Sequence, residues 1–108
     1  MGWKIFRVSG RSMYPTVDDG DYILAKNYRT KPVNGSIAVI QHPKLGTLIK
    51  RINTTEEART FIASGDNNYS AGNSSVGLFD ENEIQYQAIW RVSPAGVSKL
   101  KLIDEPTV

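Results

Sequence analysis

Two side chains of this sequence, Ser12 and Lys50, have residue types and surroundings that could together perform acyl transfer. Ser12 lies in the segment 10–16 (GRSMYPT), where a glycine-containing turn precedes the serine and Pro15 restricts the backbone around Tyr14. Such a turn can hold the serine hydroxyl in one direction and aim backbone N–H groups at a developing oxyanion. A serine hydroxyl becomes a good nucleophile only when a base takes its proton, and a neutral lysine amine can be that base.

Lys50 meets this demand only if its surroundings are apolar. In the candidate strand 47–52, alternation puts Leu48, Lys50 and Ile52 on one face, and burial of that face would lower the pKa of the lysine. An ordinary lysine is neutral only about 0.04% of the time at pH 7, and a pKa lowered by about three units, roughly 4 kcal/mol, makes a large fraction neutral. In the alternative, Ile49 points into the core and Lys50 lies in solvent, where lysine is usually found. Alternation leaves both open.

The composition removes other chemistries. With no cysteine, disulfides, thiolate metal sites and a cysteine nucleophile are excluded. A Ser-His-Asp triad would have to use His42, the single histidine. His42 precedes Pro43 at the end of a candidate strand, and we interpret it as a turn residue, because no cysteine or second histidine could complete a zinc site. We expect neither a metal nor another cofactor.

The elements that must position the two residues are short strands. A chain of 108 residues with 40% hydrophobic and 22% charged residues is typical of one globular domain with a modest core. We therefore expect a single domain over residues 1–108 with a frayed tail from about 103. Short β-type runs between turn residues predict a mostly β fold, with a helical turn at 54–59 and a long loop at 67–82. The candidate strands are 4–8, 22–26, 36–41, 47–52, 60–63, 84–92 and 99–103.

Four segments in a fixed order carry a family resemblance. Segments 10–16 (GRSMYPT), 20–21 (GD), 49–52 (IKRI) and 65–67 (GDN) together resemble the type I signal peptidase family of Ser–Lys endopeptidases. The resemblance implies a mostly β fold of strongly bent antiparallel sheets. It also implies that Ser12 is the nucleophile, that Lys50 is the general base, and that the Ser12 backbone N–H contributes to the oxyanion hole.

The same resemblance assigns supporting residues. Met13 resembles a methionine near the substrate pocket, although a core side chain is an equal alternative. Gly65, Asp66 and Asn67 are interpreted as a site-forming turn that helps to pin the lysine. Ser70 is the candidate for the serine that orients the lysine, with Ser74 as its rival. The sequence has NSS at 73–75 where the family has Asp-Ser-Arg, which puts a supporting ion pair in doubt.

Within the family, the chain resembles the compact branch of nickel-type superoxide dismutase maturation proteases. The short length, the His42-Pro43 pair before the lysine strand and the altered segment after Asn67 carry this likeness. It implies that the protease clips a short leader from a precursor bound in extended form, so that the new N-terminus can ligate nickel. The protease itself needs no metal.

Two alternatives remain open: a self-cleaving Ser–Lys domain of the SOS-repressor type, and a non-catalytic β-rich binding module. The formal charge of +2, with basic residues scattered among acidic ones, gives no reason to expect a nucleic-acid partner. No apolar run approaches the length of a membrane span. We expect a cytoplasmic protein, or a membrane-associated one if an anchor lies outside this sequence.

Overall fold

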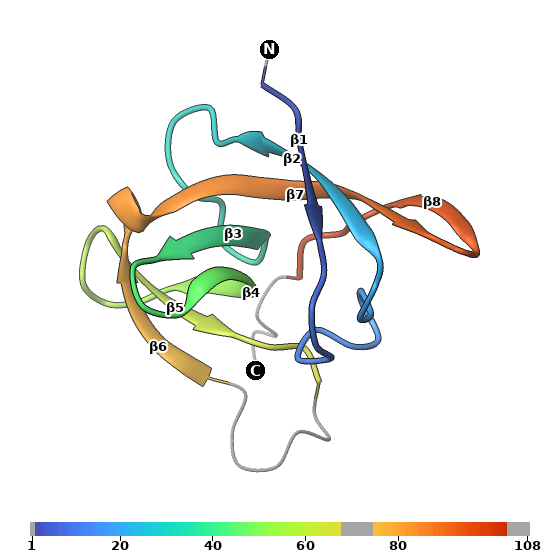
Figure 1. The fold of residues 1–108 in the computed structure, drawn as a ribbon. Helices are drawn as coiled ribbons and strands as arrows, with labels where there is room; N and C mark the ends of the chain where they lie inside the picture. Colours follow the sequence, from blue (N-terminus) through green and yellow to red (C-terminus); the bar gives the residue numbers. More distant parts are fainter. Residues whose placement is uncertain (1, 68–74, 104–108) are drawn as a thin grey trace.

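The strands of the protein form one antiparallel sheet. The computed structural model describes residues 2–67 and 75–103. Over these residues eight strands follow the order β1-β2-β7-β3-β4-β5-β6, and β8 pairs with β7 (Figure 1). The mostly β fold is therefore confirmed. The elements are β1 (Lys4–Arg7), β2 (Tyr22–Asn27), β3 (Ile37–His42), β4 (Gly46–Thr54), β5 (Thr60–Ser64), β6 (Ser75–Asp80), the short 3-10 helix η1 (Glu81–Glu83), β7 (Ile84–Ser93) and β8 (Gly96–Lys99).

The register between neighbouring strands shifts at several points in the sheet. The pairing shifts between Leu24 and Ala25 on β2, between Val39 and Ile40 on β3, and between Ala63 and Ser64 on β5. An extra residue in one strand increases the local twist and bends the strand. The expected bent antiparallel sheet agrees with this arrangement, in which the β3–β4–β5 part curls below the long strand β7 (Figure 1).

Strand β3 separates two hydrophobic clusters. Ile37 and Val39 belong to one cluster, and Ala38 and Ile40 belong to the other. All four side chains are at most 1% exposed, which explains the continuous apolar run of this strand. Burying a valine or isoleucine side chain contributes about 1.5–3 kcal/mol. Because all of β3 pairs with the first six residues of β4, Gly46 to Arg51, this double core holds the strand that carries Lys50 in place.

Two sequence expectations are wrong in the middle of the chain. The range 67–82 was expected to be a loop, but it contains β6, whose Phe79 pairs with Phe61 of β5 and is buried. The helical turn expected at 54–59 is absent from the described residues. There β4 continues to Thr54, and Thr55 donates backbone and hydroxyl hydrogen bonds to the Thr60 carbonyl at 3.3 and 3.0 Å, closing a turn.

The C-terminal part also differs from expectation. The last strand, β8, lies at Gly96–Lys99 rather than at 99–103, and the segment after it is held by single backbone hydrogen bonds. Leu100 donates to Ile89 at 2.8 Å, and Ile103 donates to Gly35 at 3.0 Å. Ile103 is therefore held beside Gly35, and residues 104–108, where most of the expected frayed tail falls, lie outside the described part. No helix in the described ranges is long and apolar enough to cross a membrane.

Candidate active site

Strand β4 buries Lys50. The side chain is 8% exposed, and its Cα lies opposite that of the fully buried Ala38. Its neighbours on the same face, Leu48 and Ile52, contact the hydrophobic cluster of Ala38. Burial lowers the pKa of the Lys50 amine because the charged form loses its hydration. Of the two orientations left open by alternation, the structure has Lys50 on the buried face.

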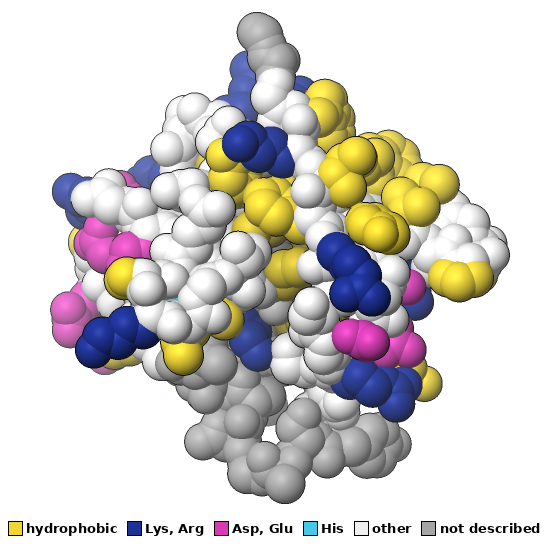
Figure 2. All heavy atoms as spheres, viewed as in Figure 1, with side chains coloured by type: hydrophobic (Ala, Val, Ile, Leu, Met, Phe, Trp, Pro, Cys, Tyr) yellow, Lys and Arg dark blue, Asp and Glu magenta, His cyan; other side chains and the backbone are white. Residues whose placement is uncertain are grey.

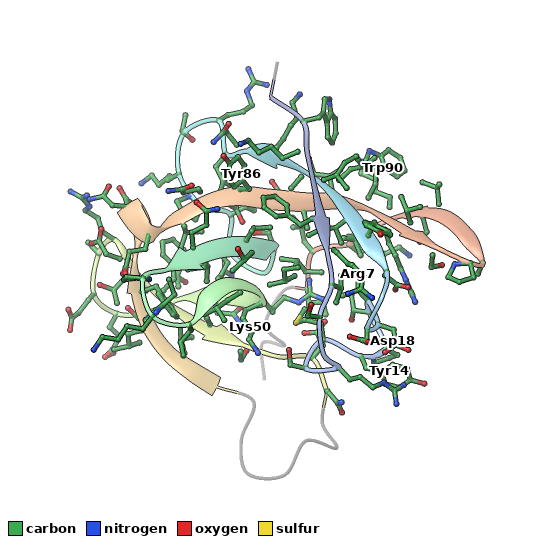
Figure 3. The ribbon with its side chains drawn as sticks, in the orientation of Figure 1. Arg7, Tyr14, Asp18, Lys50, Tyr86 and Trp90 are labelled. Atoms are coloured by element: carbon green, nitrogen blue, oxygen red, sulfur yellow. The ribbon has the colours of Figure 1, made fainter. Side chains whose placement is uncertain are left out.

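The Lys50 amine has no fixed partner among the described residues. It makes no hydrogen bond and no ion pair with any of them. No side-chain nitrogen or oxygen in the described ranges is sealed from solvent without a hydrogen-bond partner. The amine must therefore remain open at its tip. Figure 3 shows Lys50 in the lower half of the molecule, on the strand that faces the turn containing Tyr14.

A cavity of about 420 Å³ connects Lys50 with Ser12. One wall is formed by the end of β1 and the loop after it, and the other wall is the first half of β4. Figure 2 shows this side of the molecule, with apolar side chains in the hollow between β1 and the β3–β4 hairpin. The lining residues are Arg7, Val8, Ser9, Ser12, Met13, Thr47, Leu48, Ile49 and Lys50. The structure thus brings both candidate catalytic residues, 38 positions apart in the sequence, to one cavity.

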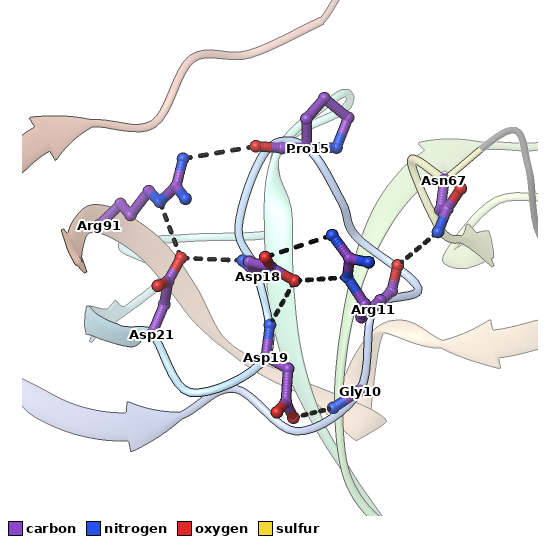
Figure 4. A network of polar contacts seen from close by, with 8 residues as sticks. All are labelled: Gly10, Arg11, Pro15, Asp18, Asp19, Asp21, Asn67 and Arg91. Atoms are coloured by element: carbon purple, nitrogen blue, oxygen red, sulfur yellow. Dashed lines mark hydrogen bonds and ion pairs between the residues drawn. The ribbon is translucent and has the colours of Figure 1, made fainter. Parts of the chain in front are cut away.

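The loop that carries Ser12 is fastened at its base. Gly10 has a φ of +84°, which favours glycine, and its N–H donates to the Asp19 carboxylate at 2.7 Å. Asp21, which is 4% exposed, accepts from the Asp18 N–H at 2.8 Å and from the Arg91 side chain at 2.8 Å (Figure 4). These bonds tie the Ser12 loop to strand β7.

Arg11 braces the outer side of the same loop. Its guanidinium pairs with Asp18 at 2.8 Å and lies over the Tyr14 ring, 4.2 Å from the ring centre. The hydrogen bond from Arg11 holds the pKa of the Asp18 carboxyl below its usual range. Both groups are exposed, so the pair positions the loop more than it stabilises the fold.

The turn at residues 65–67 clamps the backbone of Ser12. Asn67 donates its N–H to the Ser12 carbonyl at 2.9 Å and its side-chain amide to the Arg11 carbonyl at 2.8 Å (Figure 4). A Cβ at Gly65 would lie 2.3 Å from the Ser12 carbonyl oxygen, so only glycine fits there. This segment therefore forms a turn that directly contacts the Ser12 loop.

Asp66 joins the Ser12 loop to the lysine strand. Its carboxylate accepts from the Arg51 guanidinium at 2.5 and 3.2 Å and from the Thr16 hydroxyl at 2.6 Å. Arg51 is 5% exposed and donates further to the carbonyls of Gly35 and Lys101. Because Arg51 follows Lys50 directly on β4, this buried pair connects both halves of the candidate site. This role of Arg51 was not predicted from the sequence, although its residue type and its place beside Lys50 are signals for it.

The backbone around Ser12 leaves donors free for an oxyanion. Tyr14 donates to the Arg11 carbonyl at 3.1 Å and Thr16 donates to the Met13 carbonyl at 2.8 Å, which closes a tight turn. The N–H groups of Ser12 and Met13 donate to no residue of the described chain. Such fixed, unused N–H groups are what an oxyanion hole requires.

Other candidate residues lie as follows. Met13 is 1% exposed and packs in the cluster of Val8 and Ile23. It also lines the cavity. Its surroundings are therefore compatible both with a core side chain and with a side chain near the substrate pocket. Ser70 and its rival Ser74 lie outside the described residues. The role of each of these side chains therefore stays a prediction.

His42 is the last residue of strand β3 and lies directly before the turn to β4. Its Nδ1 atom accepts from the N–H groups of Lys44 and Leu45, both at 3.0 Å, and so shapes the β3–β4 connection. The ring lies edge-on to Phe79, with 6.1 Å between the ring centres. His42 is not among the residues lining the cavity. Within the described ranges, no group of three or more His, Asp or Glu side chains could hold a metal ion.

Comparison with known proteins identifies the family of the chain. A protein-family model described as Peptidase S24-like matches residues 3–88. The matched range contains Ser12, Lys50 and the turn at 65–67, which together make up the candidate site. No curated protein and no solved structure matches the chain.

Proposed function

Since the chain belongs to the Peptidase S24-like family of Ser–Lys peptidases, we propose that it is a serine endopeptidase that removes an N-terminal leader from a precursor protein. Ser12 is the nucleophile and Lys50 the general base in this proposal. One observation carries it: a buried lysine without a partner among the described residues, with a lowered pKa, lines the same cavity as a serine on a tightly held turn. A lysine in this state can act as a base without histidine.

The proposed reaction has two stages. Neutral Lys50 takes the Ser12 proton while the serine oxygen attacks the scissile carbonyl carbon, and the N–H of Ser12 donates to the oxyanion. The C–N bond then breaks, and protonated Lys50 gives its proton to the leaving amine. In the second stage water attacks the acyl-enzyme ester, with Lys50 again as base, and releases the carboxylate product and Ser12.

Two open strand edges support binding of the precursor in extended form. β1 pairs only with β2 in the described structure, and β4 pairs with β5 only through Arg51–Thr54, so the part of β4 before Arg51 has a free edge. Residues of both edges line the cavity. An extended segment between them would exchange main-chain hydrogen bonds with the strands and bring its scissile carbonyl to Ser12.

The resemblance to the compact branch also suggests which precursor protein is cleaved. The likeness to the compact branch makes a nickel superoxide dismutase precursor the first substrate to assay, with cleavage after its leader exposing a nickel-binding N-terminus. The family match also fits a domain that cuts its own chain. Incubating the pure protein alone separates the two, since self-cleavage yields fragments of the protein and leader removal leaves its mass unchanged.

The proposal is tested by cleavage of the precursor, followed by mass spectrometry of the products. We expect wild-type protein to cut at one site and Ser12→Ala to leave the precursor intact, with an unchanged circular dichroism spectrum. Ser98→Ala, which removes a hydroxyl from the exposed strand β8, is the matched control and keeps full activity. Cleavage by Ser12→Ala at the wild-type rate would refute the assignment of the nucleophile.

A further inference from the structure

A basic groove lies on the outer face of strand β7, away from the candidate active site. Two hollows of about 270 and 420 Å³ adjoin there and share Gln87 and Ile89 as their common floor. Ala88, between these two residues, packs into the cluster that contains Met13, whereas Gln87 lies opposite Ala38 of the other cluster. None of the residues that line the groove also lines the cavity of Ser12.

The walls of the groove carry five cationic side chains and no acidic one. The loop after β2 and the end of β2 supply three of them, and the segment that includes the end of β8 supplies two. These residues are Lys26, Arg29, Lys31, Lys99 and Lys101. The chain has thirteen basic and eleven acidic residues, so the fold gathers more than a third of its positive charge where no carboxylate lines the hollow.

These cations are available for a partner. The side chains of Arg29, Lys31, Lys99 and Lys101 make no hydrogen bond or ion pair within the described part of the chain, and Lys26 rests over the Trp3 ring at 5.0 Å. By contrast, four arginines elsewhere in the described structure are each paired with a carboxylate. A row of unpaired charges raises the local potential and attracts an anionic partner.

The loop that bears Arg29 and Lys31 is anchored before any partner arrives. The Tyr28 hydroxyl lies 2.7 Å from the Ser36 hydroxyl, and the Tyr28 N–H donates to Gln85 at 3.4 Å. Burial raises the pKa of Tyr28 to about 12, so its hydroxyl stays neutral at pH 7 and adds no negative charge to the groove. A fixed loop lowers the entropy that binding would cost.

We propose that this basic groove docks an acidic, extended polypeptide segment of a partner protein. The two hollows meet at Gln87 and Ile89 of β7, with cations on both walls and apolar surface from Ile89, Leu100 and Leu102 between them. An extended chain with acidic residues on one side and an apolar residue on the other complements this surface. Because the groove and the Ser12 cavity share no lining residue, such a segment binds while the cavity is occupied.

The test uses fluorescence anisotropy with Ser12→Ala protein, so that binding is measured independently of any cleavage. The probe is a fluorescein-labelled peptide of about ten residues in which glutamate alternates with leucine, and its counterpart carries glutamine in place of glutamate. We expect saturable binding of the acidic peptide only, weakening as NaCl rises from about 0.05 M to about 0.5 M.

Charge reversal in the groove provides the matched comparison. We expect the double variant Arg29→Glu/Lys101→Glu to bind the acidic peptide at least about tenfold more weakly, because two attractive contacts become repulsive. Lys44→Glu, which reverses an exposed charge in the β3–β4 turn, should bind within about twofold of the parent protein. Unchanged thermal melting of all variants will show that the fold is intact.

Three results would overturn the proposal. The glutamine peptide could bind as tightly as the glutamate peptide, or the double variant could bind as tightly as the parent. A single-stranded oligonucleotide or a vesicle with anionic lipid could bind more tightly than the peptide and displace it. The last result would assign the groove to a nucleic acid or a membrane surface instead.

Discussion

Lys50 occupies a position that costs folding free energy and that suits the base of the proposed mechanism. A charged lysine among Leu48, Ala38 and Ile52 loses hydration, and the described residues offer it no counter-ion. The fold therefore favours the neutral amine, which is the form that can accept a proton from Ser12. The same burial that weakens the fold at this point favours the protonation state that the proposed mechanism needs.

The rate of cleavage should depend on the protonation state of Lys50. Because desolvation lowers the pKa of Lys50, kcat/KM should rise with pH through an inflection below the ordinary lysine value, as the amine becomes neutral. The measurement is kcat/KM on a leader peptide between about pH 5 and pH 10, at constant ionic strength. A flat profile, or one that falls over this range, would be inconsistent with a lysine base.

The second prediction concerns the stability of Lys50→Met. Removing the buried charge while keeping a side chain of similar length should raise the free energy of unfolding by roughly 1 kcal/mol at pH 7, or several degrees in Tm, while abolishing cleavage. The pKa of Lys50 is lower in the folded than in the unfolded chain. At pH values between these two pKa values, the unfolded chain binds more protons than the folded chain, so the free energy of unfolding of the wild type rises with pH. The difference in free energy of unfolding between Lys50→Met and the wild type therefore becomes smaller as the pH rises.

Thermal melts of both proteins at pH 7 and near pH 10 check this sign. Lys44→Met is the control, since Lys44 is exposed and its replacement should change the free energy of unfolding by less than about 0.5 kcal/mol. If Lys50→Met melts at a lower temperature than the wild type at both pH values, the charged amine does not destabilise the folded protein.

Among the structural elements, the turn at 65–67 connects the Ser12 loop with the strand that carries Lys50. It contacts the Ser12 loop through Asn67 and reaches strand β4 through the pair of Asp66 and Arg51. Arg51 is buried and its partner carboxylate is nearly so, and removing one member of such a pair leaves a costly uncompensated charge. The distance between Ser12 and Lys50 thus depends on a third segment as well as on their own elements.

Gly65→Ala tests this dependence. The added Cβ would meet the Ser12 carbonyl oxygen at 2.3 Å, so the nucleophile loop must move. We expect kcat/KM on a leader peptide to fall at least about tenfold, since small displacements of a reacting group are costly, with a loss of roughly 1–3 kcal/mol in stability.

The control for this variant is Gly96→Ala in the β7–β8 turn. Gly96 has a φ of +123° and open space around its Cα, so alanine strains the backbone there without touching the site. Gly96→Ala should lose stability and keep its kcat/KM. Full activity of Gly65→Ala would mean that the turn does not position Ser12.

At the scale of the whole molecule, the curved sheet gives the chain two separate working surfaces. The open edges of β1 and β4 face the cavity, and the outer face of β7 carries the basic groove. Strand β3, buried on both sides, holds these surfaces at a fixed relation. A partner on one surface can therefore be bound without displacing a substrate from the other.

The parts that the sequence predicts are those with local signals. The strands at Tyr22–Asn27, Ile37–His42 and Gly46–Thr54 follow from apolar patterning bounded by turn residues. β6 was missed because Gly77 interrupts a short run that follows a stretch rich in Asn and Ser, and only pairing with β5 buries Phe79. The helical turn at 54–59 was wrong because continued β4–β5 pairing overrides a weak helix preference.

The candidate site also combines features that have local sequence signals with features that depend on contacts between distant residues. The segments around Ser12 and Lys50 are recognisable by their motifs, but alternation could not decide whether Lys50 or Ile49 is buried, because β4 has core contacts on both faces. The contact of Arg51 with Asp66 and the gathering of five cations over β7 join residues far apart in the chain. Only the folded sheet brings them together.

The most direct test of the central claim is the labelling of Ser12 by a serine-reactive acylating probe, followed by intact-protein mass spectrometry and peptide mapping. The Ser–Lys mechanism predicts one adduct on Ser12, formed faster as pH rises, with at least about a hundredfold slower labelling in Lys50→Met. An adduct on another residue, or equal labelling rates in wild type and Lys50→Met, would contradict it.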